Sequence, residues 1–238
     1  MPEIQIVPAI LAKTKEEFEE KVRMVAPYVS RVQIDVMDGI FVPNQTLNID
    51  KIGKLPKDLV VEYHLMVENP MEYVRKIGKK NAIYEMHIES FTKVGGRGGK
   101  GDIKAKAEEI FEALREVRKI GGKAGLALSP DTPANEVEQF LPELEIVLVM
   151  TVYPGFSGQK YLSRMESKMR WLANQGACVE VDGGIEVGTA RRAAAAGARL
   201  LGAASAIFSK PSIKGAIEAL EKDAKEGKKS FKDSSCQF

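Results

Sequence analysis

The sequence contains few cysteines and histidines, almost no net charge and no long apolar run. Its 238 residues include two cysteines, Cys178 in an apolar segment and Cys236 in a polar one, which excludes a disulfide framework and a paired-cysteine metal site. The 35 basic and 33 acidic residues nearly cancel, so nucleic-acid binding is not indicated. The N-terminus lacks a basic start, and the longest apolar run, 146–152, is too short to span a bilayer. We therefore expect a soluble cytoplasmic protein that binds neither nucleic acid nor membranes.

Short apolar segments alternate with longer amphipathic ones from end to end, which is typical of strand–helix units around a parallel sheet. No Pro/Ser-rich linker divides the chain, which favours one domain. The segment 41–59 lacks a clear helix. The predicted strands are 4–10, 31–35, 60–66, 82–87, 123–128, 146–151, 177–181 and 200–203. The predicted helices are 15–26, 70–78, 104–120, 133–140, 161–173, 187–196 and 211–224.

Eight strands with eight connections predict a single-domain α/β protein, a (β/α)8 TIM barrel spanning residues 1–225. A polar, flexible tail, 226–238, is expected to follow it, with fraying from Lys222 onward. An open doubly wound sheet is the alternative. The glycine-dense segment 93–101 lacks the residue order of a phosphate-binding P-loop, so we interpret it as a surface insertion.

Two carboxylates, Asp35 and Asp182, follow apolar strands at the end of the barrel where active sites lie. Period-two alternation places Gln33 and Asp35 on one face of their strand, opposite three apolar residues. A closed barrel brings both carboxylates to one mouth, where they are equipped to move a proton on and off carbon. Either carboxylate alone also suits a turn or a helix cap. Asp38, before Gly39, is interpreted as a turn former.

Both histidines of the chain fall at predicted strand ends on this face. Imidazole suits Zn, Fe, Co and Mn, so His64 is a candidate metal ligand. A buried, hydrogen-bonded core histidine is the alternative. We interpret His87, two residues before Glu89, as a supporting or structural residue.

Three glycine-bearing turns follow the last three strands, and barrels commonly bind phosphate at the loops after strands seven and eight. Each turn on its own also suits a simple tight connection. Three methionines lie near strand ends, where they fill the core or form an apolar cap over the reacting carbons. The candidate phosphate-binding residues are Gly155, Phe156, Ser157, Gly158, Gly183, Gly184, Ala204 and Ser205, and the candidate cap residues are Met37, Met66 and Met150.

Together these segments resemble the ribulose-phosphate 3-epimerase family, in order and with the family's spacing from about residue 4 to residue 208. The motifs that carry the resemblance are Pro8-Ala9-Ile10-Leu11, Ile34-Asp35-Val36-Met37-Asp38-Gly39, Phe41-Val42-Pro43-Asn44, His64-Leu65-Met66-Val67, Asn69-Pro70, Pro154-Gly155-Phe156-Ser157-Gly158-Gln159 and Val181-Asp182-Gly183-Gly184.

The resemblance implies a barrel enzyme, an isomerase that interconverts D-ribulose 5-phosphate and D-xylulose 5-phosphate. It implies that Asp35 and Asp182 exchange protons with C3 on opposite faces, through an enediolate stabilised by one divalent metal ion (Zn, Fe, Mn or Co). The positions that would hold this metal are Asp35, Asp182, His64 and, less securely, Gln33. His64 also contacts substrate, and a homo-oligomer is expected.

The sequence departs from the family pattern around this site. Gln33 stands where the family has a metal-binding histidine, which weakens or abolishes metal binding. Ala9, Tyr153, Ala204 and Ser157 replace a serine, an asparagine and two glycines. These departures leave three alternatives open: an epimerase for a six-carbon ketose phosphate such as allulose 6-phosphate, a sugar-phosphate-binding protein without turnover, and an epimerase that needs no metal.

Overall fold

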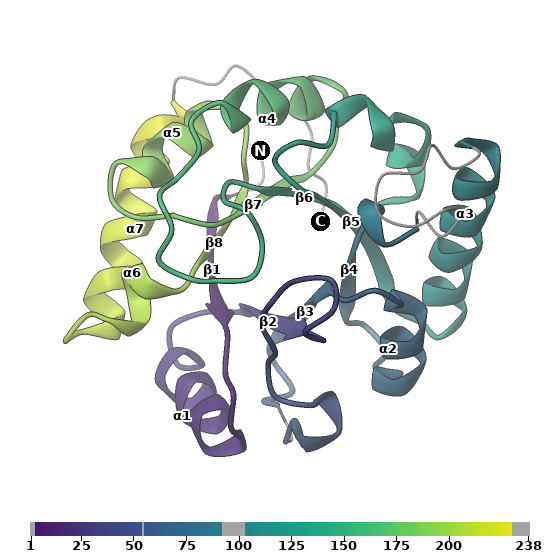
Figure 1. The fold of residues 1–238 in the computed structure, drawn as a ribbon. Coiled ribbons are helices and arrows are strands. Elements are labelled where there is room, and N and C mark those ends of the chain that lie inside the picture. The colour runs from purple at the N-terminus through teal and green to yellow at the C-terminus, as the bar shows by residue number, and fades with distance from the viewer. Residues whose placement is uncertain (1–2, 54, 92–102, 230–238) are drawn as a thin grey trace.

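The computed structural model forms a closed barrel of eight parallel strands with helices around it, which confirms the predicted TIM barrel (Figure 1). It describes residues 3–53, 55–91 and 103–229. The strands pair in chain order, and β8 closes the barrel against β1. The strands are β1 (Gln5–Ile10), β2 (Arg31–Met37), β3 (Val60–Met66), β4 (Ile83–His87), β5 (Lys123–Leu128), β6 (Ile146–Met150), β7 (Val179–Asp182) and β8 (Leu200–Ala203).

Helices occupy the connections and pack on the outside of the barrel (Figure 1). The connection after β2 contains only a short 3-10 helix among its described residues, in agreement with the sequence pattern. No helix in the described ranges is both long and apolar enough to cross a membrane. The helices are α1 (Lys15–Val25), η1 (Ile49–Lys51), α2 (Pro70–Ile77), η2 (Ile88–Phe91), α3 (Ile103–Lys119), η3 (Ala134–Glu143), α4 (Met165–Asn174), α5 (Thr189–Ala195), α6 (Ser205–Phe208) and α7 (Ile213–Lys228).

Side chains alternate along each strand between the barrel interior and the layer between strands and helices. The outward residues of β2, Val32, Ile34 and Val36, belong to the large apolar core between strands and helices. The inward residues Gln33 and Asp35 contact each other inside the barrel, with 2.7 Å between the Gln33 amide nitrogen and the carboxylate. The predicted face assignment of β2 is therefore confirmed. Polar side chains gather inside the barrel because the outer layer already buries the apolar face.

Two predicted helices differ from the observed ones, and one observed helix has no predicted counterpart. The segment predicted as helix 133–140 is the 3-10 helix η3, which contains Pro142, a residue that cannot donate a helical backbone hydrogen bond. Helix α4 begins only at Met165, because the backbone N–H of Leu162 bonds to Thr151 O at 2.8 Å and holds the preceding segment against the end of β6. Helix α6 was not predicted.

The C-terminal helix extends further than expected. Fraying from Lys222 is wrong as far as Lys228, where α7 ends, beyond the predicted end of the barrel at residue 225. The buried Asp223 carboxylate accepts hydrogen bonds from the backbone N–H groups of Gly188 and Arg191 at 2.6 and 2.9 Å. Gly227 lies so close to α5 that a Cβ there would be 1.9 Å from Arg191 O. The insertion 93–101 and residues 230–238 lie outside the described residues.

Candidate active site

The barrel brings the predicted site residues together at the carboxyl ends of its strands. All of them except Gln33 and His64 line one pocket, and these two contact its carboxylates from the barrel interior. The lining includes Asp35, Asp182, Met37, Met66, Met150, Gly155, Phe156, Ser157, Gly158, Gly183, Gly184, Ala204 and Ser205. Leu11, Gln159 and Gly202 also line the pocket, although sequence reasoning did not assign them to the site.

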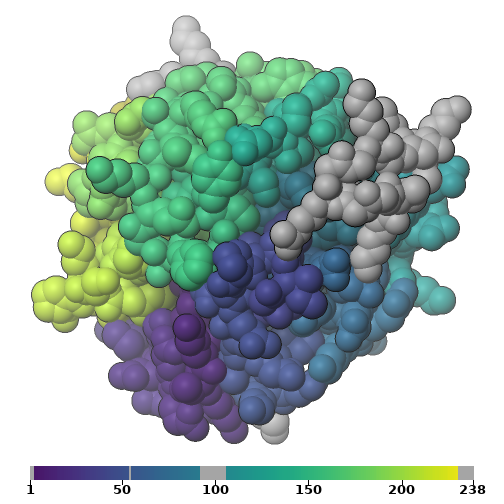
Figure 2. Space-filling model, in the orientation of Figure 1, coloured from purple at the N-terminus to yellow at the C-terminus, as the bar shows by residue number. Residues whose placement is uncertain are grey.

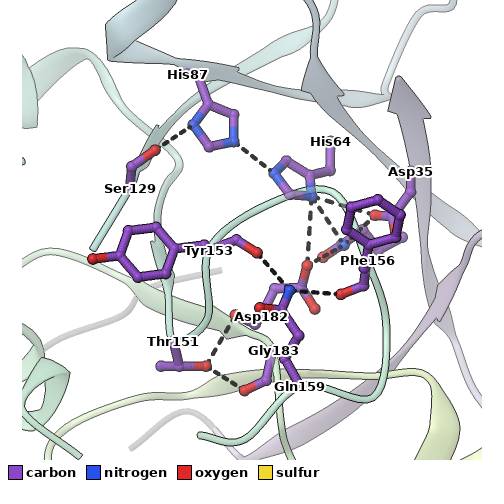
Figure 3. Close-up of polar contacts among 11 residues, drawn as sticks. Asp35, His64, His87, Ser129, Thr151, Tyr153, Phe156, Gln159, Asp182 and Gly183 are labelled. Atoms are coloured by element: carbon purple, nitrogen blue, oxygen red, sulfur yellow. Dashed lines mark hydrogen bonds and ion pairs between the residues drawn. The ribbon is translucent and has the colours of Figure 1, made fainter. Parts of the chain in front are cut away.

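Asp35, His64 and Asp182 form a compact cluster beside this pocket, with the two carboxylates lining it (Figure 3). The Nδ1 atom of His64 lies 3.3 Å from an Asp35 carboxylate oxygen and 3.6 Å from an Asp182 oxygen. One candidate ligand atom from each residue lies within 4.8 Å of the other two. Two carboxylates and an imidazole at such spacing are a donor set that suits a divalent transition metal.

Gln33 completes this cluster from β2. Its amide nitrogen lies 2.7 Å from Asp35, 3.3 Å from Asp182 and 3.3 Å from Nδ1 of His64, so the NH2 group points into the space between the three. The amide oxygen is buried and has no hydrogen-bond partner among the described residues. A rotation of the amide would turn this oxygen toward the cluster, which therefore fits a cation with Gln33 as an additional oxygen donor.

Burial and charge shift the ionisation of this cluster. Burial, followed by the nearby negative charge of Asp35, raises the pKa of Asp182 to about 8, although Gln33 and the Gly183 backbone N–H oppose the shift. Asp182 therefore carries a proton at neutral pH in the metal-free protein. Burial lowers the pKa of His64, and the adjacent Asp35 carboxylate offsets this only in part, so its imidazole is neutral at that pH.

The turn after β7 requires glycine. Gly183 and Gly184 both have positive φ, 114° and 65°, and a Cβ on Gly184 would lie 2.6 Å from the backbone nitrogen of Tyr161. The Thr151 hydroxyl at the end of β6 donates to the carbonyl oxygens of Asp182 and Gly183 (Figure 3). These contacts fix the backbone that carries the Asp182 side chain.

Two loops meet over the mouth of the barrel. The Asn44 side chain, after β2, donates a hydrogen bond to Gly155 O, after β6, at 2.7 Å, and the two segments adjoin at the centre of Figure 2. Gln159 holds the second loop in shape by donating to Tyr153 O and Phe156 O. The closed loops leave a cavity of about 40 Å³, room for about three water molecules. Parting of these two loops would enlarge the space for a ligand.

The supporting residues lie around this cluster. As expected, Asp38 is a turn residue, and one of its carboxylate oxygens accepts from the N–H groups of Ile40 and Phe41. His87 lies 3.0 Å from His64, ring nitrogen to ring nitrogen. Tyr153 departs from the family pattern without entering the pocket, because its hydroxyl donates to Asp131 on the surface.

Comparison with known proteins identifies the family. A model of the ribulose-phosphate 3 epimerase family matches residues 5–208. The chain is 38% identical over 192 residues to ribulose-phosphate 3-epimerase of Chlamydia muridarum, covering 76% of this chain and 78% of that one. It is 38% identical over 201 residues to the enzyme of the same name from Methanocaldococcus jannaschii, covering 81% and 79%.

A solved 3-hexulose-6-phosphate synthase from Salmonella typhimurium has the same fold, with a TM-score of 0.67 at 14% identity over 94% of this chain and all of that one. Such low identity carries the barrel architecture alone. The matching family model and the two relatives show more than the fold: this chain belongs to the ribulose-phosphate 3-epimerase family, a family of isomerases.

Proposed function

We propose that this protein is a ribulose-phosphate 3-epimerase, which interconverts D-ribulose 5-phosphate and D-xylulose 5-phosphate. The observation that carries the proposal is the convergence of Asp35 and Asp182 around His64, in a pocket bordered by three glycine-bearing turns. Inversion at C3 requires one group that removes a proton and another that delivers a proton to the opposite face.

The two carboxylates reach the pocket from different strands, β2 and β7, as this chemistry needs. Asp182 would deliver a proton to the substrate carbon from the face opposite Asp35. Asp35 accepts a hydrogen bond from the Gln33 amide at 2.7 Å, which orients its carboxylate to take the proton from C3. In the reverse direction the two residues exchange roles.

Asp35, His64 and Asp182, with the Gln33 amide oxygen, would hold one divalent ion of the Zn, Fe, Mn or Co class. When bound, it would supply Lewis-acid stabilisation of the negative charge that builds on the sugar oxygens. His64 would also face the sugar from the barrel interior. The neutral state of its imidazole leaves a nitrogen lone pair for either contact.

The remaining pocket residues would contact different parts of the sugar phosphate. The backbone of the turns at 155–158 and 183–184 and of Ala204 and Ser205 would bind the phosphate, as the loops after strands seven and eight do in many barrels. Met37 and Met66 pack with Val42 on one side of the pocket and Met150 packs with Val152 on another. They would cover the reacting carbons and exclude water.

The comparisons favour the five-carbon substrate over a six-carbon ketose phosphate, because both relatives carry the name ribulose-phosphate 3-epimerase. They do not favour a protein that binds sugar phosphates without turnover. A related rice protein is named a cytoplasmic isoform, and we propose the same compartment for this one. A homo-oligomer that binds neither nucleic acid nor membrane remains part of the proposal.

The test is to follow D-ribulose 5-phosphate in heavy water by proton NMR, with protein prepared in Mn²⁺ or Zn²⁺ and a parallel sample in chelator. Exchange of the C3 proton together with formation of xylulose 5-phosphate is the expected result in the metal-supplied sample. Equal rates in chelator would replace the metal-dependent mechanism by one that uses the carboxylates alone. Absence of exchange in both samples would contradict the proposed function.

A further inference from the structure

His64 is the first member of a buried chain of contacts that leads away from the pocket. Its Nε2 atom lies 3.0 Å from Nε2 of His87, and Nδ1 of His87 lies 3.0 Å from the Glu89 Oε2 atom. Figure 3 shows the contact between the two rings. Both rings are fully buried, and the Phe41 ring packs on His87 with 4.8 Å between ring centres.

The far end of this chain is a carboxylate held in one orientation. The Oε1 atom of Glu89 accepts hydrogen bonds from the backbone N–H of Ser129 at 2.9 Å and from the Thr132 hydroxyl. Although burial raises the pKa of Glu89, the hydrogen bonds from His87, Thr132 and Ser129 lower it to about 2. The charged Oε2 atom therefore faces His87 as an acceptor, and Nδ1 of His87 carries a proton.

One proton position then determines the next. With a single ring proton, on Nδ1, His87 has a lone pair at Nε2, which can only accept. The Nε2 atom of His64 must then carry a proton and donate it to His87. This leaves Nδ1 of His64 unprotonated, on the side that faces Asp35 and Asp182.

The opposite side of His64 faces the cluster. Nδ1 of His64 lies 3.3 Å from the Gln33 amide nitrogen, which can only donate, and 3.3 Å from an Asp35 carboxylate oxygen, so an unprotonated Nδ1 and this oxygen would both offer lone pairs to a cation. We infer that Glu89 and His87 are positioning residues, which fix the tautomer of His64 so that its Nδ1 lone pair faces the two carboxylates, ready for a cation.

The inference rests on the proposed function only for its use in catalysis, because the tautomers can be observed on the protein alone. The chain has two histidines, so a long-range ¹⁵N–¹H NMR spectrum of histidine-labelled protein in chelator shows four ring nitrogens. We expect opposite tautomers, with His64 protonated at Nε2 and His87 at Nδ1. A proton on Nδ1 of His64, or a doubly protonated His87 at neutral pH, would overturn the inference.

The substitution Glu89→Gln should reverse both tautomers. The side-chain oxygen of the new residue stays where Ser129 and Thr132 donate, so its NH2 group faces Nδ1 of His87. His87 then becomes protonated at Nε2, and His64 becomes protonated at Nδ1. The same spectrum reports this change, which a loss of packing alone would not produce.

The reversal should also weaken cation binding, because the proton occupies the nitrogen that faces the cluster. We expect Co²⁺ affinity, measured by optical titration, to fall about 10- to 100-fold in Glu89→Gln. The matched control is Glu145→Gln, which removes an ion pair with Lys123 away from the pocket and should change neither tautomer nor affinity. Wild-type tautomers and affinity in Glu89→Gln would contradict the inference. If that variant does not fold, the wild-type spectrum decides. If the expected tautomers are observed but the C3 proton does not exchange, the proposed function is rejected and the inference about the tautomers stands.

Discussion

The barrel contains two clusters of acidic residues, which share strands β3 and β7 but differ in access and in hydrogen-bond partners. The mouth cluster is Asp35, His64 and Asp182, and the floor cluster is Glu62, Glu85 and Glu180. Glu62 and Glu180 lie two residues before His64 and Asp182, on β3 and β7, and Glu85 on β4 pairs with His64 across the sheet. On the two shared strands, the clusters therefore occupy successive inward-facing positions.

The clusters differ in the partners that they meet. The mouth cluster borders the pocket and receives hydrogen bonds from Gln33. In the floor cluster, Arg31 pairs with Glu62, while the four carboxylate oxygens of Glu85 and Glu180 meet no donor from other residue types among the described residues. Burial, and then the charge of neighbouring glutamates, raises the pKa of both well above the ordinary value of 4.5. Burial thus favours the neutral, protonated form of Glu85 and Glu180.

The comparison teaches that two features, exposure to the pocket and fixed hydrogen-bond donors, distinguish a catalytic cluster from a structural one more than residue type does. Carboxylates that face a pocket and fixed donors can gain and lose protons during turnover. Buried carboxylates without a cation of their own, as in Glu85 and Glu180, are instead held neutral, because an unpaired buried charge is costly. Four substitutions test this difference, in order of decreasing effect.

Removal of a mouth carboxylate should have the largest effect. Asp182→Asn removes a proton-transfer group, which typically contributes 10²- to 10⁴-fold, so we expect turnover to fall about a thousandfold or more. Glu85→Gln, on the floor, is the matched control and should keep activity within about twofold. Steady-state rates with D-ribulose 5-phosphate measure both, and circular dichroism checks the fold. Similar losses in the two variants would remove the distinction between mouth and floor.

Loss of the floor arginine should have the largest effect on stability. Arg31→Leu leaves Glu62, which is fully buried, without its ion-pair partner. Breaking a buried pair in this way typically costs about 3–5 kcal/mol, so we expect the free energy of unfolding to fall by that amount. Urea denaturation measures it. A change below about 1 kcal/mol would show that the floor cluster does not depend on this guanidinium.

The two clusters were not equally visible in the sequence. Asp35 and Asp182 follow apolar strands and precede glycine turns, so local signals identified them. Glu62, Glu85 and Glu180 lie within strands that are buried on both faces, where period-two alternation does not say which face is polar for a functional reason. They come together only when β3, β4 and β7 close into the barrel, and no local signal reports that contact.

The same limit explains other differences. The eight strands were predictable because their apolar runs are short and are separated by longer amphipathic segments. The end of α7 was not, because the buried residues Asp223 and Gly227 depend on contacts with α5 rather than on the charged local sequence. The loop contact between Asn44 and Gly155 joins residues far apart in the chain and could not be inferred from spacing.

The pH dependence of stability should show the floor carboxyls directly. Because the folded pKa of Glu85 lies above its ordinary value of 4.5, the folded protein holds more protons than the unfolded chain as pH rises from that value. The contribution of the Glu85 carboxyl to the free energy of unfolding is therefore fully present below about pH 4.5 and is lost as pH rises toward the folded pKa. The side chain in Glu85→Gln is neutral at every pH and has no proton to lose. We therefore expect the Tm of this variant to fall less than that of the wild type between pH 5 and pH 8. Parallel curves of Tm against pH for the two proteins would contradict a protonated Glu85. The control is Glu145→Gln, which removes the ion pair of Glu145 with Lys123 and should give the same curve as the wild type.

The smallest effect should come from the loop contact that covers the mouth and has no counterpart on the floor. Asn44→Ala removes the hydrogen bond to Gly155 O, which is worth about 1 kcal/mol, so the closed loops lose about fivefold in population relative to the open ones. Because closure holds the substrate against Asp35 and Asp182, we expect KM to rise by about that factor with little change in the Tm. Asn48→Ala is the matched control in the same connection, because the Asn48 side chain only accepts from Asp50 N at the start of η1. Equal changes of KM in both variants would show that the loop as a whole, rather than its bond to Gly155, controls access to the mouth cluster.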